Sequence, residues 1–134
     1  MANARERLAP PVVVGADGRI REWPGDVQDA EPGHRHVSHL FGLHPGRQFT
    51  YEESPEKLAA ARRSLEHRLA NGGGHTGWSR AWVINHWARL GEGDLAHEHL
   101  QQLFLDEGSN SWFGVPGDDG RHRPYASAQE RLER

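Results

Sequence analysis

Side chains able to do chemistry are densest in residues 31–39, which read EPGHRHVSH. This segment holds three histidines, one arginine and one glutamate. Guanidinium groups donate hydrogen bonds, and a neutral imidazole both donates and accepts them. Such a set suits a polyhydroxylated ligand when a rigid helix start presents it at the edge of a concave site with aromatic walls. We therefore interpret residues 31–39 as a candidate ligand-binding rim.

Two other interpretations of the same segment stay open. Zinc accepts histidine nitrogen and carboxylate oxygen as ligands, and His36 and His39 would share one face of a helix. However, the pattern is not the HExxH arrangement of zinc proteases, and Arg35 would repel a cation. We predict no metal and no other cofactor. Alternatively, these side chains satisfy buried backbone groups at a turn, and that role is compatible with a binding rim.

A second polar and aromatic group lies at residues 75–82, which read HTGWSRAW and follow a run of glycines. Loop ends beside a buried helix are common positions for binding groups. The indole of Trp78 offers an apolar ring face to a sugar, and Thr76 stands just ahead of it, so we expect both to line a cleft. Trp82 and Trp87 are instead expected in the core because of their positions on the helix.

The elements that must position these groups are predicted to be short helices. The clearest is residues 54–70, where Ser54 can act as the N-cap, Pro55 suits the first turn and apolar residues recur at helical spacing. Residues 34–44 show the same spacing until a Pro-Gly pair stops it. A short helix is therefore expected there too.

Two further helices are predicted after the glycine run. Residues 78–90 are apolar on nearly every side, which predicts a buried helix, and residues 94–104 are amphipathic. The short link between them favours an antiparallel pair. Tryptophans on this pair would leave a large apolar patch, so we expect further protein to pack there. Residues 8–33 are predicted to be irregular, with a hairpin of short strands around a turn at residues 15–18.

Composition argues against several classes of protein. The 134 residues fit one small domain, and with a net charge of -3, a pI of about 6.3 and no basic stripe we expect no nucleic-acid partner. The chain has no cysteine, which excludes disulfides and thiolate metal sites. No apolar run approaches the roughly 20 residues of a membrane span, and the first residues lack the apolar core of a signal peptide. If native, such a start points to the cytoplasm.

Residues 31–46 resemble the GHRHxSHLxGLxPG signature of glycoside hydrolase family 95, whose members are typified by α-L-fucosidases. Residues 15–23, GADGRIREW, and residues 73–82, GGHTGWSRAW, are similar to further segments of that family in the same order. The resemblance predicts that residues 1–105 are a fragment of the family's catalytic domain. Residues 106–134 do not resemble the family, and we predict an irregular tail there.

The resemblance implies an all-α fold in which this chain supplies about four helices, paired as hairpins, of an (α/α)6 barrel. It also implies hydrolysis of terminal α-L-fucosyl linkages with inversion, which needs a protonated carboxyl and a general base on opposite faces of the sugar. In the family these are a Glu upstream and an Asp downstream of the region seen here. We therefore predict no catalytic residue and no turnover by this chain alone. By their positions in the motif, Arg35 and His36 match residues that hold the sugar.

The resemblance further implies a fucosylated oligosaccharide or glycan as the ligand, and the rest of the barrel as a partner if it is a separate polypeptide. Two alternatives remain, namely a carbohydrate-binding remnant without catalysis and a small metal-binding protein built on the histidines. Saturable fucose binding that His36→Ala abolishes would favour the first, and bound metal would favour the second. The sequence leaves open whether the sugar is L-fucose or L-galactose, which linkage is cut and the oligomeric state.

Overall fold

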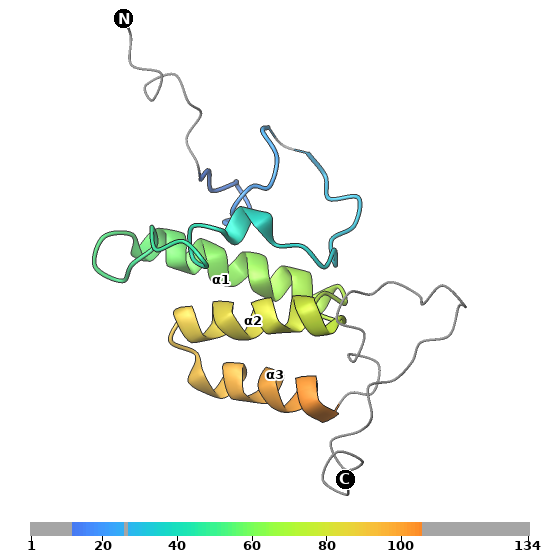
Figure 1. Cartoon of the computed structure of the whole chain (residues 1–134). Coiled ribbons are helices and arrows are strands. Elements are labelled where there is room, and N and C mark those ends of the chain that lie inside the picture. The colour runs from blue at the N-terminus through green and yellow to red at the C-terminus, as the bar shows by residue number, and fades with distance from the viewer. Residues whose placement is uncertain (1–11, 26, 106–134) are drawn as a thin grey trace, which may run out of the picture.

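The computed structural model describes residues 12–25 and 27–105. Within these ranges it has one short 3-10 helix followed by three α-helices: η2 (Ser38–Leu40), α1 (Pro55–Ala70), α2 (Gly77–Arg89) and α3 (Gly93–Leu105). Figure 1 shows the three α-helices stacked in chain order, with α2 between α1 and α3, and the N-terminal segment running along α1. This part of the chain is all-α, as predicted.

Helix α1 follows from its local sequence, with one difference at its start. Pro55 occupies the first turn, and the positive φ of Gly72 lets the chain turn away after Asn71. Ser54 stands at the N-cap position, but its hydroxyl makes no capping bond to the helix. Instead it accepts a hydrogen bond from the Thr50 amide at 2.9 Å. The predicted capping role of Ser54 is therefore wrong, because the hydroxyl closes the preceding loop.

Helix α2 begins with a reciprocal cap. Thr76 Oγ1 accepts a hydrogen bond from the Ser79 amide at 3.2 Å, and Ser79 Oγ accepts one from the Thr76 amide at 3.1 Å. The helix buries Val83 and Trp87, whereas Trp78 in its first turn is 39% exposed. Among the described residues, α2 is thus buried on one face and half-buried or exposed on the others.

Helices α2 and α3 form the predicted antiparallel hairpin. Gly91, with a φ of 71°, makes the tight turn between them. At the open end, Arg80 Nη1 lies 3.0 Å from His99 Nδ1 and donates to Gln102 Oε1 at 2.5 Å. These contacts tie the start of α2 to the end of α3, and the paired helices fit part of an (α/α)6 barrel.

The N-terminal hairpin predicted around residues 15–18 is reduced to one antiparallel bridge between Val14 and Ile20. Hydrogen bonds from the Gly15 amide to the Arg19 carbonyl and from the Arg21 amide to the Val13 carbonyl flank this bridge, both at 2.8 Å. The Ile20 amide faces away from Val14 and donates to the Ser64 hydroxyl of α1 at 2.9 Å. The buried Ile20 side chain joins the core at the same point, so this short hairpin is fastened to α1.

The helix expected at residues 34–44 is only the 3-10 turn η2, followed by further turns up to Pro45. Val37, just before η2, has a φ of -131° and a ψ of 41°, which is not helical backbone. The carbonyl groups of Glu31 and Pro32, upstream of this segment, accept hydrogen bonds from Arg68 of α1. These bonds hold the start of the segment against α1, and residues 34–37 that follow are not helical.

The core lies where α1, α2 and the loop after η2 meet. Its buried apolar side chains are Ile20, Leu40, Leu43, Phe49, Leu58, Ala60, Ala61, Leu65, Val83, Trp87 and Leu90. Arg62 of α1 also lies over the Trp87 ring of α2, 5.6 Å from its centroid. In the ranges that the structure describes, no helix is long and apolar enough to span a membrane.

Candidate functional site

The segment 31–39 is held very close to the C-terminal end of α1. Gly33 lies against the peptide bond that follows Asn71, and a Cβ atom at Gly33 would overlap the Asn71 carbonyl oxygen and lie 2.7 Å from its carbon. Only glycine permits this approach of two backbones. The glycine that opens the GHRH motif therefore fixes where the histidines and the arginine stand.

His36 and Trp78, both predicted as site residues, meet across the structure. Their ring centroids are 5.3 Å apart with the planes at 78°, an edge-to-face contact. His34 makes a second edge-to-face contact with His36 at 4.8 Å. Both His36 and Trp78 are exposed, so a ligand can reach them. This pairing joins two motifs that lie about 40 residues apart.

An apolar hollow of about 270 Å³ opens beside this pair. Aromatic rings form most of its wall, with Trp78 and Trp82 5.7 Å apart and Phe41 on the opposite segment. Its lining residues are His36, Val37, Ser38, Phe41, Trp78 and Trp82. Ring faces with a few polar groups at the edge match the apolar faces and hydroxyl groups of a sugar.

The aromatic wall continues along α2 beyond the hollow. Trp82, expected in the core, is half-buried and contacts both His44 at 5.5 Å and His86 at 5.9 Å between ring centroids. His86 Nδ1–H donates to the Trp82 carbonyl at 2.6 Å. Burial lowers the pKa of His86 to about 4, although this hydrogen bond opposes the shift. A neutral imidazole therefore supports the indole of Trp82 at neutral pH.

Arg35 and Thr76, the other two predicted site residues, lie outside this hollow. Arg35 is exposed and lines a second, polar hollow together with His34, His75 and Asn71 among others. Thr76 is buried, and its hydroxyl is engaged with Ser79 in the cap of α2. Its cleft-lining role stays a prediction, while its visible effect is to fix the turn that carries Trp78.

The histidines of the GHRH segment do not form one cluster. His39 is turned away from His36 and is buried behind the loop, with Nδ1 3.9 Å from Glu22 Oε2. Burial lowers the pKa of His39 to about 4, and Arg68 lowers it further, whereas Glu22 opposes the shift. The separation arises because residues 34–37 are not helical. Among the described residues, no group of three His, Asp, Glu or Cys side chains is placed to hold a metal.

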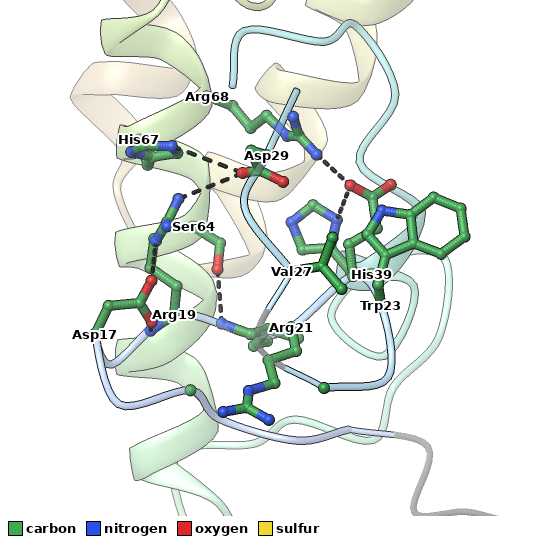
Figure 2. A pocket seen from close by; sticks show the side chains of 14 residues that line it. Asp17, Arg19, Arg21, Trp23, Val27, Asp29, His39, Ser64, His67 and Arg68 are labelled. Atoms are coloured by element: carbon green, nitrogen blue, oxygen red, sulfur yellow. Dashed lines mark hydrogen bonds and ion pairs between the residues drawn. The ribbon is translucent and has the colours of Figure 1, made fainter. Parts of the chain in front are cut away.

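A charged pocket behind the loop contains residues that the motif analysis missed (Figure 2). Figure 2 shows Arg68 and His39 approaching one carboxylate, which belongs to Glu22. Arg68 is 4% exposed and stands on the buried face of α1, three residues after Leu65. The sequence did carry one signal for Arg68, namely a charged residue within the apolar stripe of α1. A buried arginine needs polar partners, so this position indicates an ion pair or hydrogen bonds.

Comparison with known proteins places the chain in a family. Residues 1–124 match the glycosyl hydrolase family 95 catalytic domain. The chain belongs to this family. The match runs past residue 105, the predicted end of the family segment. Residues 106–134 lie outside the described ranges.

Three curated relatives are similar to this chain. Alpha-L-fucosidase 2 of Arabidopsis thaliana is 43% identical over 101 residues, which is 75% of this chain and 12% of the relative. Proteins named probable alpha-fucosidase A from Aspergillus niger and Aspergillus oryzae are each 30% identical, over 81% and 75% of this chain. The chain spans only 12% to 15% of the length of these relatives.

Proposed function

We propose that this chain supplies the sugar-binding wall of a family 95 α-L-fucosidase, with a terminal α-L-fucosyl residue of a glycan lying in the hollow between His36 and Trp78. The observation that carries the proposal is that the two family motifs meet at this aromatic hollow. The names of the relatives, α-fucosidases from a plant and two fungi, support the choice of sugar.

Each residue has a chemical task in this proposal. The Trp78 ring face packs against the C–H face and the C5 methyl group of L-fucose, while His36 exchanges hydrogen bonds with a hydroxyl group. Arg35, which lines the neighbouring polar hollow, donates to a hydroxyl group of the next sugar in the glycan. Thr76 holds the first turn of α2 and so keeps Trp78 facing the sugar.

Hydrolysis with inversion is proposed for the whole enzyme, in which the acid and the base come from other segments. Inverting glycosidases need two carboxyl groups on either side of the scissile bond. The described lining of the hollow contains no Asp or Glu. On this proposal the chain alone binds the sugar and does not cleave an aryl α-L-fucoside.

Titration of the 134-residue chain with L-fucose, followed by NMR of the tryptophan indole N–H signals, tests the binding. We expect saturable shifts at Trp78, and His36→Ala or Trp78→Ala should weaken binding at least about tenfold. His97→Ala is the matched control, since His97 is an exposed histidine on α3. If the folded wild-type chain shows no saturable shift of its indole signals, the proposal that this chain binds the sugar is wrong. Equal weakening by His97→Ala would show that the hollow is not the site.

A further inference from the structure

Both ends of the loop that carries Arg35 and His36 are fastened to one ion pair, between the buried Arg68 and the half-buried Glu22. At the start of the loop, Arg68 Nη1 donates to the Glu31 carbonyl at 2.8 Å and to the Pro32 carbonyl at 3.3 Å. Arg68 Nη2 donates to Glu22 Oε2. One guanidinium from α1 therefore holds the loop backbone and the Glu22 carboxylate together.

The same carboxylate holds the end of the loop. Glu22 Oε1 accepts a hydrogen bond from Ser38 Oγ at 3.3 Å, and the His39 imidazole lies 3.9 Å from Oε2. Figure 2 shows Arg68 and His39 both directed at one oxygen of this carboxylate. Arg68 and Glu22 thus close a ring around residues 33–37, the residues that face the two hollows.

The energetics favour a positioning role over a general stabilising one. A buried ion pair contributes little net stability compared with a well-packed apolar pair, because both charges must leave water. Removing Glu22 is nevertheless costly, since the buried Arg68 guanidinium then loses its ion partner. The planar guanidinium of Arg68 serves three acceptors at once, which a lysine ammonium cannot match in the same geometry. The pair is suited to fixing one loop conformation.

We propose that Glu22 and Arg68 are positioning residues for the sugar-binding loop. They hold residues 33–37 in the conformation in which His36 contacts Trp78 and Arg35 lines the polar hollow. Neither residue lines the hollow beside Trp78, so each acts through the loop and not by touching the sugar there. The role in sugar binding rests on the proposed function, whereas the contacts that hold the loop do not depend on it.

The test compares Arg68→Met and Glu22→Gln with Arg62→Met as matched control. Arg62 lies on the same helix and pairs with Glu66 and Glu92, away from the loop. Amide hydrogen exchange at residues 33–37, the dissociation constant for L-fucose and the melting temperature are measured for each chain. Glu22→Gln keeps the size of the side chain and serves if Arg68→Met does not fold.

We expect Arg68→Met and Glu22→Gln to speed exchange at residues 33–37 at least about tenfold and to weaken L-fucose binding by a similar factor. Arg62→Met should change neither, even where it lowers the melting temperature. Unchanged exchange in both loop variants, or equal changes in Arg62→Met, would overturn the inference. If the wild type binds no L-fucose, the proposed function fails, but the exchange data still decide the positioning role.

Discussion

Replacing Gly33 with alanine tests the close approach that places the loop. The added Cβ would overlap the Asn71 carbonyl oxygen and lie 2.7 Å from the carbonyl carbon. Since carbon atoms in contact sit at about 3.5 Å or more, the loop and the end of α1 must move apart by about 1 Å. The hydrogen bond from Arg68 to the Glu31 carbonyl, which is 2.8 Å long in the wild type, would then be lost.

The magnitude follows from these two effects. Overpacking costs about 1–3 kcal/mol, and a lost hydrogen bond to a charged group costs about 1.5–3 kcal/mol. Replacing glycine also removes about 0.4–1 kcal/mol of unfolded-state entropy, which acts in the opposite direction. We therefore expect Gly33→Ala to lower the free energy of unfolding by about 2–5 kcal/mol. For a domain of this size the melting temperature falls by about 10 °C or more.

Circular dichroism at the helix band, followed during heating, measures this effect. Gly93→Ala is the matched control, because nothing lies within 4 Å of a Cβ at that position and its φ is not positive. The control should differ from the wild type by less than about 1 kcal/mol. A melting temperature for Gly33→Ala equal to that of Gly93→Ala would refute the argument that the two backbones touch.

Two further predictions concern stability. Burial lowers the pKa values of His39 and His86 to about 4 in the folded chain. In the unfolded chain both have a pKa of about 6.5, so between about pH 4 and pH 6.5 the unfolded chain binds more protons than the folded one. Denaturant titration should therefore find full stability above about pH 6.5 and a progressive loss toward pH 4, on the order of 3 kcal/mol per histidine. His86→Gln should remove about half of that pH dependence, and a pH-independent wild type would contradict the assignment. Leu65→Ala, at a fully buried position, should cost about 2–5 kcal/mol in the same assay, and a cost below 1 kcal/mol would contradict its place in the core.

The α-helices could be predicted because their signals are local. Pro55 and the glycines after Asn71 mark the ends of α1, and the short link after Leu90 makes α2 and α3 antiparallel. The shorter elements depended on distant partners. Ser64 of α1 binds the amide of Ile20, and Arg68 binds carbonyl groups just ahead of the expected helix at residues 34–44.

The candidate site could be predicted only in part for the same reason. The motifs identified His36 and Trp78 as binding residues, but their contact at 5.3 Å depends on how α1 and α2 pack. Helical spacing suggested that His36 and His39 share a face, and the non-helical backbone at Val37 separates them. Glu22 lies in the GADGRIREW segment, but that motif gave no sign of its role in holding the loop, and Arg68 lies outside every motif. Both roles depend on contacts with residues distant in sequence.

The proposed function depends on a fucosyl residue that lies against Trp78 beside His36. The most direct measurement is a set of nuclear Overhauser effects from the C5 methyl protons of L-fucose to the protein, at a saturating sugar concentration. We predict contacts to the Trp78 indole protons and to the His36 ring, all lost in Trp78→Ala. Contacts to other side chains only, or contacts to His36 that persist in Trp78→Ala, would show that the fucosyl residue does not lie against Trp78.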